Sequence, residues 1–166
     1  LQTGKLLDVL SGHEGPIAAL DMHGNMLAST SWDGTIKLWD VYKNECIETV
    51  EHGCDVLAVA FRPDGLHVAT ATINGNINVW EVETGDSIAC LEGRNDLKGG
   101  IKEDTLQSGK SQNQQKCFTT LCYSADGSLI LAAGRSIYAC VYSVKAKTLV
   151  HKFQLTSNHS LDGTLD

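Results

Sequence analysis

The stretch "SWDGTIKLWD", from Ser31 to Asp40, contains two of the three tryptophans of the chain, Trp32 and Trp39. It opens with a polar Asp-Gly turn and continues as an alternating run that ends in Trp-Asp. Alternation of apolar and polar residues over about six positions indicates a half-buried β-strand, and Asp-Gly before it is typical of a tight turn. The stretch therefore predicts a turn followed by a strand, and the two tryptophans fall in different parts of it.

The strand with Trp39 recurs along the chain. "TIKLWDV" ends on Trp39, "NINVWEV" ends on Trp80 41 residues later, and "SIYACVYSV" has Tyr142 at the same place. Upstream, "FRPDGLHVATAT" aligns without a gap to "YSADGSLILAAG", while the first copy, "DMHGNMLASTS", is two residues shorter. Each copy reads as four short strands, and four strands in about 40 residues are the signature of a β-propeller blade. No segment has strong helical periodicity, so the chain is expected to be all-β.

The pattern Gly12-His13, an apolar strand, then Ser31-x-Asp33-x-Thr35-x-x-x-Trp39-Asp40 resembles a WD40 repeat. The resemblance implies a partial β-propeller of about three four-stranded antiparallel blades plus one extra outer strand. Propellers usually need four to eight blades to close, so we expect a piece of a larger propeller. The expected units are an outer strand of a preceding blade at 4–10, blades at 12–51 and 52–92, a polar insert at 93–116, a degenerate blade at 117–154 and a C-terminal tail at 155–166.

The same resemblance implies a buried hydrogen-bonded tetrad in each blade. In the first unit the matching residues are His13, Ser31, Asp33 and Trp39. In the second unit they are His52, Thr72, Asn74 and Trp80, and in the third Gln114, Gly134, Ser136 and Tyr142, where the network is expected to be largely lost. A buried indole N–H needs an acceptor, so this role is physically sound for a strand tryptophan.

A Ser-His-Asp set also suggests a hydrolase. A nucleophilic serine needs an exposed hydroxyl and an oxyanion hole, whereas Ser31 lies in strand register with apolar neighbours and outside any G-x-S-x-G elbow. "DTLQSGKS" resembles a phosphate-binding loop but has Asp104 where the motif needs its first glycine. We therefore expect no enzyme, no catalytic residues, no cofactor and no metal site. The six cysteines are expected to be buried free thiols of an intracellular protein, in preference to a disulfide framework or a zinc site.

The composition of the chain indicates which kinds of partner it can bind. Its 166 residues are 42% hydrophobic and carry a formal net charge of −7, with a pI near 5.3. This charge argues against general binding of phosphate backbones, which needs clustered Lys and Arg. No apolar run reaches the 18 residues that would span a bilayer. We expect protein partners, with no membrane and no small-molecule substrate.

Loops at one face of a propeller are the expected place for a partner, and Trp32 is the strongest candidate there. An exposed tryptophan is enriched at interface hot spots, although Trp32 could instead pack against a loop of the neighbouring blade. The candidate partner-binding residues are Trp32, Glu14, Asp55, Arg94 and Lys98. In the insert the acidic residues nearly cancel the basic ones, which favours a solvated loop there.

Four phrases resemble the periodic tryptophan protein 2 family across nearly the whole chain: "TGKLLDVLSGHEGPI", "EGRNDLKGG", "CFTTLCYSADGS" and "NHSLD". The resemblance implies a place in the second propeller of a nucleolar scaffold, within the UTP-B subcomplex of the small-subunit processome. It implies processing of small-subunit precursor rRNA inside a small nucleolar ribonucleoprotein particle, with processome subunits as partners. RNA contact would belong to the parent complex, since the charge of this chain does not support it. The alternative is a generic intracellular WD40 adaptor, cytoplasmic in location, that recruits proteins to a signalling or ubiquitin-ligase complex.

Overall fold

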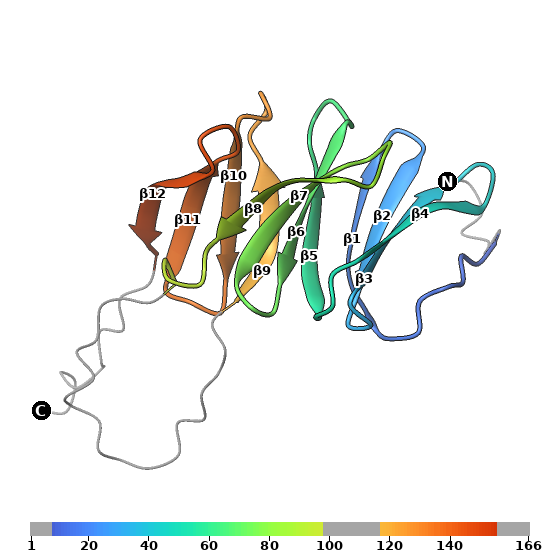
Figure 1. Cartoon of the computed structure of the whole chain (residues 1–166), viewed down its shortest axis with the longest axis horizontal. Helices are drawn as coiled ribbons and strands as arrows, with labels where there is room; N and C mark the ends of the chain where they lie inside the picture. Colours follow the sequence, from blue (N-terminus) through green and yellow to red (C-terminus); the bar gives the residue numbers. More distant parts are fainter. Residues whose placement is uncertain (1–7, 98–116, 156–166) are drawn as a thin grey trace, which may run out of the picture.

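A computed structural model describes residues 8–97 and 117–155 of the chain. Its regular structure consists of twelve strands in three four-stranded antiparallel sheets, which stand side by side in a row (Figure 1). The all-β architecture expected from the sequence, a partial WD40-type propeller, is confirmed. Within the described ranges no helix is long and apolar enough to cross a membrane.

Each sheet is built from four consecutive strands. The first sheet contains β1 (Ile17–His23), β2 (Met26–Ser31), β3 (Thr35–Asp40) and β4 (Glu45–Glu51). The second contains β5 (Val56–Phe61), β6 (His67–Thr72), β7 (Asn76–Glu81) and β8 (Ser87–Glu92). The third contains β9 (Phe118–Tyr123), β10 (Leu129–Gly134), β11 (Tyr138–Ser143) and β12 (Thr148–Gln154).

Two of the units expected from the sequence lie partly outside the described ranges. Of the outer strand expected at 4–10, residues 8–10 form no strand and residues 4–7 are not described. Only residues 93–97 of the insert and Leu155 of the tail are described. All six cysteines are free thiols, as the sequence predicted, but the prediction that they are buried was wrong for most of them. Only Cys117 and Cys140 are buried, whereas Cys46, Cys90 and Cys122 are exposed.

The Asp-Gly turn of the opening stretch shows why glycine stands there. Gly34 has a φ of +80°, and its amide donates to the Ser31 carbonyl at 3.3 Å. The second sheet repeats the turn with Gly75, at a φ of +84°, whose amide donates to the Thr72 carbonyl. Glycine adopts such angles without steric cost, so the turn between the second and third strands is encoded locally.

The second sheet lies between the other two and has a hydrophobic core on each face. The core that it shares with the first sheet contains Ala28, Leu38, Val59, Phe61, Val68 and Val82. The core that it shares with the third sheet includes Ala58, Ala60, Ala69, Ala71, Leu121, Tyr123, Ile130 and Tyr142. On this second face, alanines leave room for the large side chains of the third sheet, so the two layers interdigitate.

A hydrogen bond also joins the first strands of neighbouring sheets. The Asp21 carboxylate on β1 accepts from the Phe61 amide on β5 at 2.6 Å. This bond fixes the position of the first sheet along the second, because a charged acceptor to a backbone donor is strong and directional.

Candidate functional site

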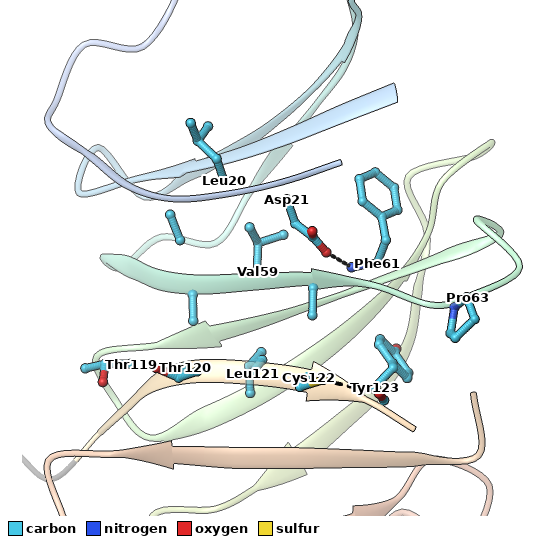
Figure 2. A pocket seen from close by; sticks show the side chains of 13 residues that line it. Leu20, Asp21, Val59, Phe61, Pro63, Thr119, Thr120, Leu121, Cys122 and Tyr123 are labelled. Atoms are coloured by element: carbon cyan, nitrogen blue, oxygen red, sulfur yellow. Dashed lines mark hydrogen bonds between the residues drawn. The ribbon is translucent and has the colours of Figure 1, made fainter. Parts of the chain in front are cut away.

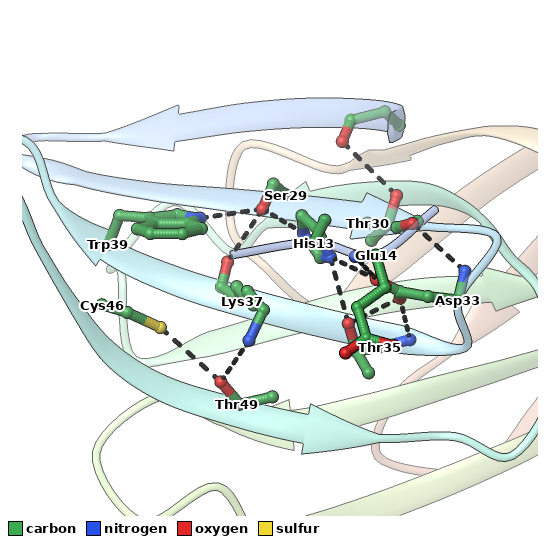
Figure 3. Close-up of polar contacts among 12 residues, drawn as sticks. His13, Glu14, Ser29, Thr30, Asp33, Thr35, Lys37, Trp39, Cys46 and Thr49 are labelled. Atoms are coloured by element: carbon green, nitrogen blue, oxygen red, sulfur yellow. Dashed lines mark hydrogen bonds and ion pairs between the residues drawn. The ribbon is translucent and has the colours of Figure 1, made fainter. Parts of the chain in front are cut away.

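A chain of polar side chains crosses the first sheet (Figure 3). The Trp39 indole N–H donates to Ser29 Oγ at 2.8 Å, and the same Oγ lies 2.7 Å from His13 Nε2. The other ring nitrogen of the histidine, Nδ1, lies 3.0 Å from Asp33 Oδ2. Since a carboxylate only accepts, the His13 proton belongs on Nδ1, and Nε2 accepts from the Ser29 hydroxyl. The network thus runs from buried tryptophan to carboxylate with every member satisfied.

The serine in this network is Ser29, and the assignment of Ser31 was wrong. Strand pairing explains the difference, because Trp39 lies opposite Leu27, which makes Ser29 its diagonal neighbour on the same face. Ser31 lies four residues from Leu27, about 13 Å along the strand at 3.3 Å per residue. Its hydroxyl instead accepts from the Asp33 amide at 3.1 Å and supports the turn. His13, Asp33 and Trp39 occupy the places that the sequence assigned to them.

Asp33 ties the segment before β1 to the turn after β2. Its carboxylate accepts from the Thr35 hydroxyl at 2.7 Å, from the Glu14 and Thr35 amides at 2.9 Å each, and from His13. Burial by itself raises the pKa of Asp33, but these hydrogen bonds outweigh it and hold the pKa well below its usual range. The ionised form is therefore part of the fold.

The second sheet repeats the network with different residues from those predicted. Trp80 donates to Thr70 Oγ1 at 3.1 Å, and His52 Nε2 lies 3.0 Å from the same oxygen. Asn78 Nδ2 lies 3.3 Å from His52 Nδ1. Thr70 thus replaces the predicted Thr72, again because the diagonal neighbour of the tryptophan lies two residues earlier on the strand. Asn78, on β7, replaces the predicted Asn74 in the turn before that strand. Burial lowers the pKa of His52 to about 4, and the ring is neutral.

In the third sheet, the buried aromatic residue has its hydrogen-bond partner outside the sheet. Ala132 occupies the place of Ser29 and Thr70, so the strand offers no hydroxyl. The Tyr142 hydroxyl donates instead to Asp96 Oδ2 at 2.9 Å, in the connection after β8. Of the predicted third set, Gly134 has no side chain to offer, Ser136 accepts from the Tyr138 amide at 3.1 Å, and Gln114 lies outside the described residues.

The role of Asp96 was not predicted from the sequence. This residue lies in the phrase "GRNDL", where neither spacing nor a known motif connects it to Tyr142, 46 positions later. One local signal accompanies it. A Cβ on Gly93 would overlap the Phe118 ring and would lie 2.8 Å from the Gly75 carbonyl oxygen and 2.9 Å from the Tyr142 hydroxyl oxygen, so only glycine fits beside this contact.

The Ser29–His13–Asp33 geometry has the connectivity of a hydrolase triad but not its accessibility. The Ser29 side chain is buried, and its oxygen already accepts from the Trp39 indole. A nucleophile must reach the substrate, so this set serves the structure of the blade. Within residues 8–97 and 117–155, no three His, Cys, Asp or Glu side chains gather as metal ligands.

A groove of about 390 Å³ runs across the first strands of the three sheets (Figure 2). Its lining mixes apolar side chains with polar groups, among them the Thr119 and Thr120 hydroxyls and the Cys122 thiol on β9 and the Asp21 carboxylate on β1. Both Asp21 oxygens accept from backbone amides, Oδ2 from Phe61 and Oδ1 from Met22 at 2.9 Å. The Cys122 thiol donates to the Tyr123 carbonyl at 3.3 Å, so its hydrogen bond goes to the backbone and not to a base.

The structure brings three of the five candidate partner-binding residues to one edge of the first two sheets. The Trp32 amide donates to the Pro16 carbonyl at 3.1 Å, and the Glu14 amide donates to the Asp33 carboxylate beside it. Asp55 lies in the connection from β4 to β5, where neighbouring Cys54 lies 3.4 Å from the Cβ position of Gly34. We call Glu14, Pro16, Trp32 and Asp55 the Trp32 edge.

The Trp32 side chain is 56% exposed, although the residues on both sides of it are held by hydrogen bonds. The side chain is therefore not buried against a loop of the neighbouring blade, which was the alternative that the sequence left open. Arg94 is also exposed, in the connection after β8, and Lys98 lies outside the described residues.

Comparison with known proteins agrees with this geometry. The family described as "WD domain, G-beta repeat" matches residues 4–40 and 44–81. These two stretches are WD40 repeats. The recognition of WD40 blades from Gly12-His13 and the Trp39-Asp40 strand is therefore confirmed.

Relatives of this chain match it over almost its whole length. They include periodic tryptophan protein 2 of Arabidopsis thaliana, 47% identical over 99% of this chain, and its homologue in Mus musculus, 48% identical over 98%. The Saccharomyces cerevisiae protein of the same name is 38% identical over 100% of this chain. The chain spans only 18–19% of the length of these relatives.

A solved structure, that of the computationally designed Ika4 protein, shares the fold. It aligns with a TM-score of 0.68 and 24% identity, covering 91% of this chain and 80% of that one. At this identity the likeness shows the architecture of the WD40 chain and nothing of its partners.

Proposed function

We propose that this chain is a non-catalytic scaffold module that binds other proteins through the Trp32 edge. We further propose that it acts in the nucleolus, within a particle that processes small-subunit precursor rRNA. The exposed Trp32 on a hydrogen-bonded turn carries the binding part of the proposal. The similarity of nearly this whole chain to one part of periodic tryptophan protein 2 supports the cellular part, together with what that family implies.

Trp32 is suited to anchor a partner because its position is fixed before binding. The Ser31 hydroxyl and carbonyl accept from the Asp33 and Gly34 amides, and Trp32 itself donates to Pro16. A large aromatic side chain on a rigid turn gains contact area on binding at little entropic cost. Tryptophans of this kind are over-represented among interface hot spots, where truncation costs about 2 kcal/mol or more.

The charge of the first two sheets favours a protein partner over RNA. Residues 8–97 contain fifteen Asp and Glu against four Lys and Arg, a net charge of −11. Glu14 and Asp55 bring two of these carboxylates to the Trp32 edge. Such a field repels phosphate backbones and attracts a segment with basic side chains around an apolar contact.

The test is affinity purification of the intact protein carrying Trp32→Ala, with quantification of co-purifying proteins and small nucleolar RNA. Tyr42→Ala is the matched control, because Tyr42 is an exposed aromatic residue at the opposite edge of the first sheet. We expect W32A to reduce recovery of at least one small-subunit precursor protein about tenfold or more, from a loss of about 2 kcal/mol. Unchanged recovery with W32A refutes the binding surface, and recovery of cytosolic adaptor partners alone refutes the nucleolar role.

A further inference from the structure

The turns between the second and third strands of the three sheets lie at one edge of the molecule and are held in the same way. Each turn begins with the residue directly after the second strand, whose amide donates to the carbonyl just before the first strand. The surface that begins at the Trp32 edge therefore continues, at equivalent places, onto the third sheet. The amides of Trp32, Ile73 and Arg135 donate to the carbonyls of Pro16, Asp55 and Cys117 at 3.1, 2.9 and 2.9 Å.

This surface stays exposed even where a sheet has a neighbour on each side. The second sheet lies between the other two (Figure 1), and Asn74 in its turn is exposed. Arg94, in the connection after β8, is exposed as well. Neighbouring sheets cover the faces of a sheet and leave the ends of its strands uncovered, so the exposure of these turns does not depend on where the row of sheets ends.

Two arginines lie at the third-sheet end of this surface. Gly93, directly before Arg94, packs on the first residue of β9, since a Cβ there would overlap the Phe118 ring. Arg135 is held beside the same strand by its bond to Cys117. Both arginines are exposed, and in the part of the chain that the structure describes neither makes an ion pair. Their guanidinium groups are therefore available to a carboxylate from outside, in the bidentate geometry that arginine favours.

The two ends of the surface carry opposite charge. The Trp32 edge contains the carboxylates of Glu14 and Asp55, whereas residues 117–155, which include Arg135, contain four Lys and Arg against one Asp, a net charge of +3. Two steps between sheets, each about 10 Å, separate the first turn from the third, and an extended chain covers about 20 Å in about six residues. A ligand that bridges the two ends must therefore carry opposite charges about six residues apart.

We propose that the partner of the Trp32 edge binds as one extended polypeptide segment that crosses the three turns. Basic and apolar side chains of the segment contact Trp32 and its neighbouring carboxylates, and an acidic residue about six positions away binds Arg94 and Arg135. A nucleic acid does not fit this pattern, because its phosphates would meet the carboxylates of the Trp32 edge at one end. This inference rests on the proposed function and adds to it the acidic residue of the partner and its spacing.

Charge reversal in the intact protein tests the acidic end of the segment. We expect Arg94→Glu/Arg135→Glu to reduce recovery of the same proteins that Trp32→Ala loses, by about threefold or more, because an attractive contact becomes repulsive. Lys43→Glu/Lys145→Glu makes the same change of charge on exposed lysines at the opposite edge and should leave recovery unchanged.

The outcomes separate this inference from the proposed function. If W32A loses these proteins but R94E/R135E keeps them, the extended segment is refuted while the proposed function stands. If R94E/R135E lowers only the recovery of RNA, the arginines bind phosphate and the segment is refuted as well. Unchanged recovery with W32A refutes both.

A crosslink in the intact protein with its bound partners tests the spacing. In Arg135→Lys, a carbodiimide should join the new amine to a carboxylate of the partner through an amide bond, and it should join Glu14 to a lysine of the same partner. Mass spectrometry should find both positions in one segment, about four to ten residues apart once side-chain lengths are allowed for. Lys145, an exposed native amine at the opposite edge, should give no crosslink to that segment. Crosslinks to two different proteins, to distant positions of one protein, or equally from Lys145 rule out a single segment across the turns.

Discussion

Replacing Ser29 with alanine should destabilise the first sheet far more than replacing Ser31, although both serines are buried on the same strand. Ser29 Oγ accepts from the Trp39 indole at 2.8 Å and lies 2.7 Å from His13 Nε2. Ser29→Ala leaves both of those buried groups without a partner. Ser31→Ala removes one acceptor, which serves the Asp33 amide at 3.1 Å.

The magnitude follows from the number of groups left unsatisfied. Each buried polar group that loses its partner costs about 1–3 kcal/mol. Two groups, the indole N–H and the imidazole nitrogen, give about 2–6 kcal/mol for Ser29→Ala, since the His13 side chain is also buried. One group, the amide of half-buried Asp33, gives about 1 kcal/mol for Ser31→Ala, because that amide can regain water. The free energy of unfolding should therefore separate the two variants by at least 1 kcal/mol.

Urea denaturation followed by circular dichroism measures both variants, and the slope of the transition must be unchanged for the comparison to hold. A double-mutant cycle with Trp39→Phe isolates the indole bond, because the cost of Ser29→Ala should fall by about 1 kcal/mol when the indole is absent. Equal destabilisation by the two serine variants, or an unchanged cost of S29A in the W39F background, would refute the assignment of Ser29.

The structure makes three further predictions. Because burial lowers the pKa of His52 to about 4 from 6.5, folding favours the neutral ring; the stability it provides is complete above pH 6.5 and is lost as the pH falls toward 4. At 1.36 kcal/mol per pKa unit, and about halved for solvent screening, the free energy of unfolding should fall by about 1–2 kcal/mol between pH 7 and 4. The urea midpoint measures this loss, and His52→Gln should flatten its pH dependence. Gly93→Ala should lower the thermal midpoint strongly, because the new methyl would overlap the Phe118 ring and lie 2.8 Å from the Gly75 carbonyl oxygen; Gly12→Ala, with 3.2 Å to the Trp39 ring, should cost less, and a reversed order would contradict the packing. Tyr142→Phe should cost about 1 kcal/mol in chemical denaturation, because Asp96 is partly exposed and regains water, and a loss above 3 kcal/mol would mean that the carboxylate stays buried.

The repeat and its strands were predictable because they are encoded locally. The Asp-Gly turn before Thr35 and the alternation that ends on Trp39 need no information from the rest of the chain. Glycine at residue 34 carries the positive φ that the turn requires. The four-stranded unit followed from counting such signals along one period.

The hydrogen-bond partners were not predictable to the residue, because they depend on register between strands. Ser29 and Ser31 have the same side-chain direction, and only the pairing of Leu27 with Trp39 decides between them. The same ambiguity explains why Thr72 was predicted in the second sheet where the structure has Thr70. Asp96 was missed for a different reason, since its partner lies across an insert of unrelated sequence.

Each sheet is made of four consecutive strands, and this has a consequence for synthesis on the ribosome. A sheet can pair as soon as its fourth strand has left the exit tunnel, without waiting for any later part of the chain. Asp96 is translated before Tyr142, so the acceptor for the third sheet is already present when the tyrosine emerges. The order of translation thus places the acceptors of the three buried aromatic donors, Trp39, Trp80 and Tyr142, ahead of the donors themselves.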